Sequence, residues 1–209
     1  MRYVPTGPEP TDAELWRQAV EGDAEGFGVL FDRHSRAVYN HCFRRIGDWS
    51  VADDLTSVVF LEAWRRRAEI RLDGDSALPW LLGVAANVAR NRNRAMRRHR
   101  EALARIPARP DAPDHADDVA ERLDAEQAMA RLLRLVKKLS RDDQDVLALC
   151  AGDGLSYAQA AVALGVPVGT VRSRLSRAKS RLRELLANEY PARPSGERLP
   201  TLNPTQEEL

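Results

Sequence analysis

Side chains that could do chemistry gather most densely between positions 167 and 183, which hold six lysines and arginines and no acid. Apolar residues repeat there at intervals of three and four, which predicts an amphipathic helix with its stripe on the core: Val168, Val171, Leu175, Ala178, Leu182 and Leu185. The remaining positions carry hydroxyl and cationic side chains, which suit phosphates and base edges in a major groove: Thr170, Arg172, Ser173, Arg174, Ser176, Arg177 and Lys179. An ordinary surface helix would usually mix glutamate with its arginines, so we expect this helix to bind DNA.

The residues before this helix predict the element that positions it. Ser156 and Gln159 have the spacing of a capping box, which marks the start of a helix over 157–164. Gly165 follows and can take the left-handed backbone of a tight turn. Two short helices joined by such a turn form a helix-turn-helix.

A second candidate surface lies in the first half of the chain. The span 80–109 holds eight arginines and one acid, and its helix, from Pro79 to about Arg100, begins apolar and becomes cationic. The polar loop 71–78 before it could hold an unstacked base of a single strand. The candidate nucleic-acid residues here are Asp73, Gly74, Asp75, Ser76, Trp80, Asn87, Arg90, Asn91, Arg94, Arg97 and Arg98.

The overall pattern predicts an all-α protein, because helix formers dominate and β-branched residues are scattered. Helices are expected over 11–20, 24–46, 50–67, 79–100, 120–138, 141–151, 157–164 and 168–188. Prolines and aspartates interrupt the chain in its middle, which predicts a linker. We therefore expect two small helical domains, the second a four-helix domain with the helix-turn-helix: domain one at 11–103, linker at 104–120, domain two at 121–189 and a flexible tail at 190–209.

Enzymatic and metal-dependent functions find little support. The four histidines, His34, His41, His99 and His115, carry no ligand or catalytic spacing, and CxxC, P-loop, GxSxG and HExxH motifs are absent. We expect no catalysis, no cofactor and no metal, with the histidines at ordinary helical surface or core positions. Cys42 and Cys150 are expected to be buried, inert thiols. No apolar run approaches ~18 residues and the first residues form no secretory signal, so a cytoplasmic protein without membrane insertion is expected.

Three motifs, in order, resemble the extracytoplasmic-function sigma factors of bacterial RNA polymerase. Asp53-Asp54-Leu55-Thr56 with Phe60-Leu61-Glu62-Ala63-Trp64-Arg65 resembles region 2.2 of that family. The run from Pro79 to Val88 resembles regions 2.3 and 2.4, and the run from Gly154 to Ala178 resembles region 4.2. The resemblance covers about 24–187.

The resemblance implies partners and roles. The helix over 50–67 would bind the coiled coil of the largest subunit of core RNA polymerase, within an assembly that includes the second-largest subunit, through Asp53, Asp54, Leu55, Phe60, Leu61, Glu62 and Trp64. The loop 71–78 and the helix after it would melt and capture the −10 element, and the recognition helix would read the −35 element of the promoter DNA. The linker would run toward the RNA exit path, and a separate anti-sigma factor often holds such proteins inactive. Ser57 and Val58 depart from the Gln and acidic residue that many members carry there, so polymerase contacts at these positions should be more apolar or lost.

Two binding alternatives stay open. A stand-alone helix-turn-helix regulator would explain 121–189 equally well, but it leaves the apolar helix over 50–67 and the basic helix after it without a role. It would bind duplex DNA alone, whereas a sigma factor usually binds poorly until core enzyme is present. An anti-sigma or adaptor role, in which the chain would bind only protein, is disfavoured by the two cationic helices.

Overall fold

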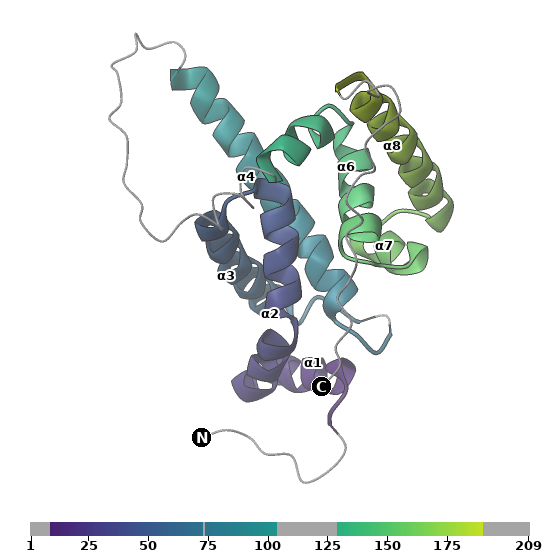
Figure 1. The fold of residues 1–209 in the computed structure, drawn as a ribbon. Coiled ribbons are helices and arrows are strands. Elements are labelled where there is room, and N and C mark those ends of the chain that lie inside the picture. The colour runs from purple at the N-terminus through teal and green to yellow at the C-terminus, as the bar shows by residue number, and fades with distance from the viewer. Residues whose placement is uncertain (1–8, 73, 104–128, 190–209) are drawn as a thin grey trace, which may run out of the picture.

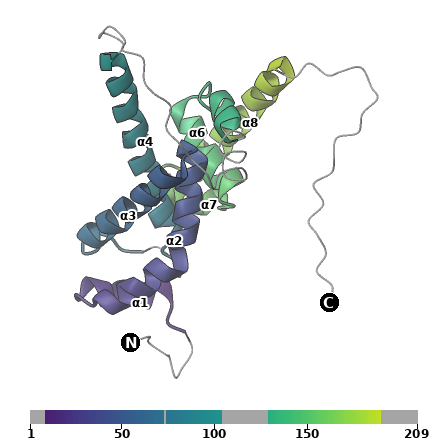
Figure 2. The same cartoon turned by 60° about the vertical axis from the view of Figure 1, so that its left-hand side comes forward.

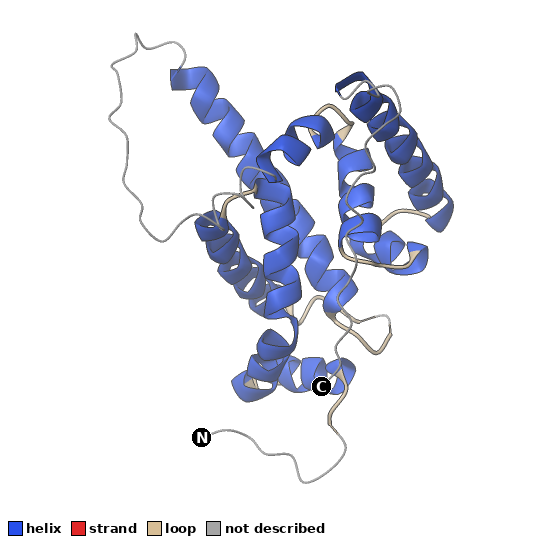
Figure 3. Cartoon of the chain, in the orientation of Figure 1, coloured by secondary structure: helices blue, strands red, loops and turns tan. Residues whose placement is uncertain are grey.

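The computed structural model describes residues 9–72, 74–103 and 129–189, and this part of the chain contains helices, turns and loops but no strand (Figure 3). The expected all-α fold is therefore confirmed. The elements are α1 (Asp12–Val20), α2 (Ala24–Ile46), α3 (Trp49–Arg66), α4 (Leu78–Leu103), a helical segment at 129–136, α6 (Arg141–Leu147), the π-helical turn η1 (Ala148–Gly152), α7 (Tyr157–Leu164) and α8 (Val168–Glu189). The expected linker, the tail and the first residues of the helix predicted over 120–138 lie outside the described residues.

The helix boundaries rest on short-range hydrogen bonds that the sequence predicts. At Ser156 the side chain accepts the N–H of Gln159 at 3.2 Å, and the Gln159 side chain accepts the N–H of Ser156 at 2.9 Å, which completes the expected capping box. Thr11 caps α1 with Glu14 in the same way. Gly47 ends α2 with φ of 79°, a left-handed conformation in which a Cβ would be strained.

The predicted helix over 141–151 is not uniform. Its second half is the π-helical turn η1, because the N–H of Asp153 donates to the carbonyl of Ala148, five residues earlier. Such widened turns are rare and occur mostly as single turns within helices. This one carries Asp153 to a position facing α2, where its carboxylate contacts His41.

The first core lies among α1, α2, α3 and α4. In Figure 1, α1 lies across the lower end of α2, while α3 and α4 flank α2. Fully buried side chains such as Val38, Val59 and Leu81 fill the centre. Trp16 of α1 meets Trp80 of α4 edge to face, with 5.1 Å between ring centroids, so α1 is tied to the start of the long helix α4.

The second core is built by α6, η1, α7 and α8, and α4 completes it. Leu82 of α4 is buried among Val146, Leu149 and Val171, whereas its neighbour Leu81 belongs to the first core. At Gly83 an added Cβ would lie 2.3 Å from the carbonyl oxygen of Ala163, so α4 and α7 approach more closely than any side chain would allow. The two helical units are thus docked along α4, seen from a second side in Figure 2. The sequence predicted the units but not this docking.

Candidate nucleic-acid interface

The predicted recognition helix is α8, and most of its amphipathic pattern is confirmed. Val171, Leu175 and Ala178 are buried beneath it. The outward positions are exposed at Arg172, Ser173, Ser176, Arg177 and Lys179, and half-buried at Thr170 and Arg174. The expectation of a core position is wrong for Val168, which is 40% exposed because it begins the helix before the stripe reaches the core. Leu182 and Leu185 are only half-buried, since α8 runs on past the core.

The turn before α8 has the predicted helix-turn-helix geometry. Gly165 lies at φ of 63°, and its N–H donates to carbonyls of the preceding turn of α7. The N–H of Val166 donates to the carbonyl of Ala161 at 3.1 Å, which closes the end of α7. These bonds fix the direction in which α8 leaves α7, and so hold its outer face in one orientation.

Two arginines of α8 are held by acids of α6. The guanidinium of Arg177 donates through Nε and Nη2 to both carboxylate oxygens of Asp143, at 3.1 and 2.8 Å. These hydrogen bonds hold the pKa of Asp143 below its ordinary value. Arg174 lies 2.6 Å from Asp142. Arg172, by contrast, is exposed and makes no ion pair with any residue that the structure describes, so its guanidinium is available to a ligand.

The basic half of α4 is mostly solvent-facing. The candidate nucleic-acid residues that are exposed on α4 are Asn87, Asn91, Arg94, Arg97 and Arg98. Arg90 differs, because it is half-buried and ion-paired with Asp145 of α6. Trp80 is half-buried against Trp16 and presents only part of its ring.

The loop before α4 is anchored by the carboxylate of Asp12, at the start of α1. Asp12 is buried and accepts the N–H of Ala77 at 2.8 Å and the hydroxyl of Ser76 at 3.2 Å. It also lies 2.6 Å from Nε2 of His34 and pairs with Arg33. Burial raises the pKa of Asp12, but the hydrogen bonds from Ala77, Arg33 and His34 outweigh it, so this pKa lies below its ordinary value.

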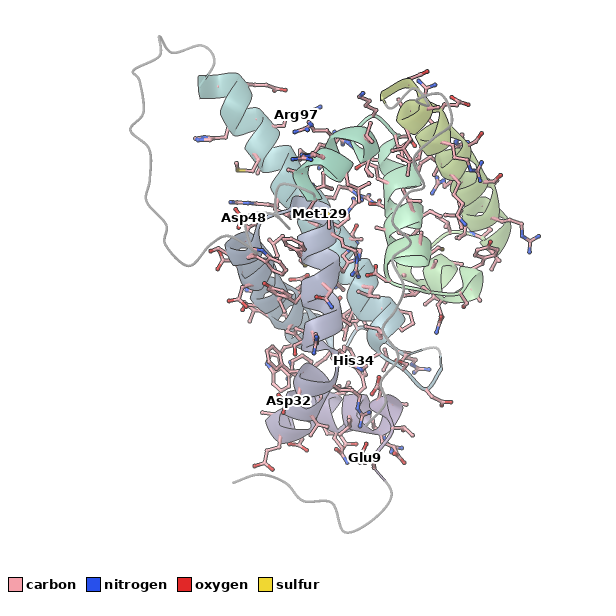
Figure 4. The ribbon with its side chains drawn as sticks, viewed as in Figure 1. Glu9, Asp32, His34, Asp48, Arg97 and Met129 are labelled. Carbon is pink, nitrogen blue, oxygen red and sulfur yellow. The ribbon has the colours of Figure 1, made fainter. Side chains whose placement is uncertain are left out.

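This anchoring fixes the loop at one end only. Gly74, Asp75 and Ser76 are exposed, and the candidate Asp73 lies outside the described residues. Figure 4 shows His34 at the level where α1, α2 and this loop meet. The loop therefore presents polar groups to solvent from a fixed base.

The polymerase candidates divide between the surface and the core of α3. Asp53, Asp54 and Leu61 are exposed, and Glu62 and Trp64 are half-buried. Leu55 and Phe60 instead lie in the first core, so they pack α3 against its own unit and offer no surface for a partner.

The outer face of α3 carries exposed apolar side chains, and one of them, Val58, stands where the sequence departs from the pattern of the family that it resembles. Val58 is 45% exposed and Leu61 is 57% exposed, and residues three apart lie on one face of a helix. Phe31 of α2 is also exposed and packs edge to face on Phe60, with 4.8 Å between ring centroids. Phe31 was missed because its helical spacing resembles that of the core positions around it.

Comparisons with known proteins match both units. The family models "Sigma-70 region 2" and "Sigma-70, region 4" match residues 30–100 and 129–182. The extracytoplasmic-function (ECF) RNA polymerase sigma factor SigK of Mycolicibacterium vanbaalenii is 31% identical, over 82% of this chain and 87% of its own length. The chain belongs to the extracytoplasmic-function RNA polymerase sigma factors. A stand-alone regulator is not favoured, because the region 2 match covers α3 and most of α4, which such a regulator would leave without a role.

Other relatives agree with this family. The extracytoplasmic-function sigma factor BldN of Streptomyces coelicolor is 31% identical over 84% of this sigma factor, which spans 66% of BldN. The solved structure of CnrH in complex with the cytosolic domain of CnrY shares 26% identity, covers 85% of this chain and 98% of CnrH, and superposes with a TM-score of 0.62. RpoE of Bartonella quintana, solved with the anti-sigma factor NepR, is 24% identical with a TM-score of 0.56 and supports the fold alone.

Two buried acids join the units of this sigma factor. Asp145 of α6 accepts from Arg45 of α2 at 2.6 Å and also from Arg90 of α4. Asp153, after η1, lies 2.5 Å from Nδ1 of His41 and also pairs with Arg44. Each acid is more than 50 residues from its partners, so no local pattern could have indicated these contacts.

The two cysteines and the possible metal ligands were the remaining groups with potential chemistry. Cys42 is fully buried, and burial raises its pKa to about 11, as expected for an inert thiol. Cys150 is only half-buried, although burial raises its pKa too. Within the described ranges, no cluster of three or more His, Cys, Asp or Glu side chains could hold a metal ion. None of the helices described there has the length and apolarity to cross a membrane.

Proposed function

We propose that this sigma factor reads the −35 promoter element through α8, and that Arg172 and Ser173 make its central contacts. The observation that carries this proposal is the exposed outer face of α8, which has no acid before Glu184 and lies above a buried apolar stripe. Arginine can donate two hydrogen bonds to a guanine edge, and serine can reach a phosphate or a base. Arg177 holds α8 on α6 through Asp143, so we assign it a positioning role as well as phosphate contact.

The −10 element is assigned to α4 and the loop before it. Asn87, Asn91, Arg94 and Arg98 are exposed along one helix, and arginines there can bind the backbone of a melted strand. The loop at 74–76, fixed on Asp12, would hold an unstacked base. Arg90 joins this set only when Asp145 releases it.

Binding to core polymerase is assigned to the outer face of α3. The exposed apolar residues Val58 and Leu61 lie beside the exposed acids Asp53 and Asp54, a mixed surface suited to the coiled coil of the largest subunit. The two binding units then correspond to 11–103 and 121–189, with the tail at 190–209 outside both.

The docked arrangement is proposed as the resting form of the free protein. Arg90 cannot reach DNA while Asp145 holds it, so engagement of the −10 element requires region 4 to move away from α4. CnrH is known in complex with a partner's cytosolic domain, which supports a protein partner of anti-sigma type for this chain also. The protein would act in the cytoplasm, by binding and without catalysis.

Transcription with purified core polymerase on genomic fragments tests the assignment. Arg172→Ala should remove promoter-specific transcripts while leaving co-elution with core intact, and Leu61→Asp should remove both. Arg183→Ala is the matched control, because it removes an exposed arginine of the same helix beyond the helix-turn-helix. Tight duplex binding by the chain alone, with no co-elution and no transcripts, would contradict the proposal.

A further inference from the structure

A strongly basic hollow of about 280 Å³ lies where the two units meet, and the promoter assignments leave Lys137 and Arg141 in its lining unexplained. Its cationic lining comes from both units: Arg45, Arg90, Arg94, Arg97, Lys137 and Arg141. Among the described residues that line it, none is acidic. Figure 4 shows Arg97 on the outer half of α4, on the side of the helical segment that begins at Met129.

The surrounding acids do not balance this charge. Asp145 pairs with Arg45 and Arg90, and Arg97 makes only an exposed contact of 3.5 Å with Glu101. Arg94, Lys137 and Arg141 make no ion pair with any residue in the described part of the chain. At least three cations therefore face one hollow without a counter-charge.

Two buried donors at the hollow also lack acceptors. The Nε atoms of Arg45 and Arg90 are inaccessible to solvent and have no hydrogen-bond partner among the described residues. The Arg45 side chain is only 7% exposed, and burial together with the neighbouring Arg90 lowers its pKa despite the pairing with Asp145. Buried polar groups are normally hydrogen-bonded, because an unpaired one is costly. Arg45 and Arg90 share the single carboxylate of Asp145, so a net positive charge lies beneath the hollow, and an anion bound there would offset it.

We propose that this hollow binds a small polyphosphate anion, either inorganic pyrophosphate or the phosphate chain of a nucleotide, and that the bound anion locks region 2 to region 4. Guanidinium groups bind phosphate oxygens with paired, charge-assisted hydrogen bonds. The volume lies at the small end of ligand pockets, which suits a few phosphoryl groups. A multiply charged anion matches a site with several unbalanced cations.

Because the hollow is lined by residues of both units, a ligand bound in it would stabilise the docked arrangement. Arg94 and Arg97 belong to region 2, while Lys137 and Arg141 belong to region 4, so the complete site exists only when the units are docked. A ligand that binds one conformation alone shifts the population toward it. The anion would also occupy arginines assigned to the −10 element. This inhibitory consequence rests on the proposed function, whereas the binding itself does not.

Calorimetric titration of the full chain with pyrophosphate, and separately with ADP, tests the site at constant ionic strength. We expect saturable binding of one pyrophosphate, weakened about tenfold or more by Arg141→Gln through loss of charge-assisted hydrogen bonds. Arg134→Gln is the matched control, because Arg134 is exposed on the neighbouring segment 129–136 and does not line the hollow. Tighter binding of ADP than of pyrophosphate would identify the nucleotide as the source, and equal binding would identify the phosphates alone. Absence of saturable heat, or equal weakening in both arginine variants, would overturn the proposal.

Gly83→Ala tests whether anion binding requires the docked units, and it changes no charge. Its Cβ would meet the carbonyl of Ala163, so the variant should separate α4 from α7 and lose pyrophosphate binding. Circular dichroism and thermal unfolding check that its helices remain. In Asp145→Asn, which loses the ion pairs between the units and should favour the separated form, pyrophosphate should lower the radius of gyration measured by small-angle X-ray scattering. Unchanged pyrophosphate binding in folded Gly83→Ala, or no compaction of Asp145→Asn by pyrophosphate, would refute the proposal that the anion holds the two units together. These binding measurements are independent of the transcription assays, so a failure of the proposed promoter assignment would not change the result for pyrophosphate binding.

Discussion

Replacing Asp145 by asparagine removes one charge at the junction of the two units and keeps the side-chain shape. Asp145 is 1% exposed, and within the described residues its carboxylate is the only acid that pairs with Arg45 or Arg90. The neutral amide of Asp145→Asn would leave the nearly buried guanidinium of Arg45 without a counter-charge. The docked form should therefore become much less stable than the separated form.

The expected size follows from the burial of the pair. Removing one partner of a buried ion pair costs roughly 3–5 kcal/mol, because the other charge stays desolvated. Here the cost applies only while the units are docked, since separation returns Arg45 and Arg90 to water. Each 1.4 kcal/mol is a factor of ten, so the docking equilibrium should shift about a hundredfold or more toward the open form. The cores of the separate units should keep their stability.

Small-angle X-ray scattering and hydrogen exchange measure this opening. Asp145→Asn should raise the radius of gyration and speed exchange at α6 and at the crossing of α4 with α7. Asp142→Asn is the matched control on the same helix, because Asp142 is 51% exposed and its pair with Arg174 is worth about 0–1 kcal/mol. Equal scattering for the original protein and Asp145→Asn would refute the view that this ion pair holds the units together.

Three further predictions concern stability. The pKa of Asp12 lies below its ordinary value, so the stability that its carboxylate contributes is full above about pH 4 and is lost as pH falls through the lowered pKa. Asp12→Asn should therefore lower the thermal midpoint at pH 7 and flatten the fall of the midpoint between pH 7 and pH 3. A variant whose midpoint falls as steeply as that of the original protein would contradict this. Ser156→Ala removes the acceptor for the Gln159 N–H and should lower the free energy of unfolding of region 4 by about 1 kcal/mol in urea titrations, whereas no change would show that the cap is dispensable. Leu81→Ala empties a fully buried position and should cost roughly 2–5 kcal/mol in the first unit, and a loss below 1 kcal/mol would mean that the core closes around it.

Local elements could be predicted because their causes lie within a few residues. The hydrogen bonds between Ser156 and Gln159 span three positions, and the left-handed Gly165 needs only the absence of a Cβ. The buried stripe of α8 follows from helical periodicity. For the same reason Val168 was placed wrongly: periodicity gives a face, but only the fold shows how far along the helix the core extends.

The docking of the two units could not be predicted, because its causes are far apart in the sequence. Arg45 and Asp145 are 100 residues apart. Local sequence explains each one separately, because a basic residue is favoured at the end of a helix and an acid near its start. Leu81 and Leu82 are neighbours in one apolar run, yet they fill different cores. Exposed Phe31 and Val58 have the spacing of buried residues, so only the structure shows that they lie on the surface and not in a core.

Arg90 pairs with Asp145 and is also assigned to promoter DNA, and it cannot contact both at once, so we expect docking and promoter binding to compete. Arg90 faces the carboxylate of Asp145 in the docked form and would face DNA phosphate in the open form. Salt weakens DNA binding steeply through counterion release, but it screens a buried ion pair much less. Rising ionic strength should therefore favour the docked form over the promoter-bound one, and the balance should be set at Arg90 and not at Arg177, whose acid partner Asp143 lies within region 4 and does not connect the units.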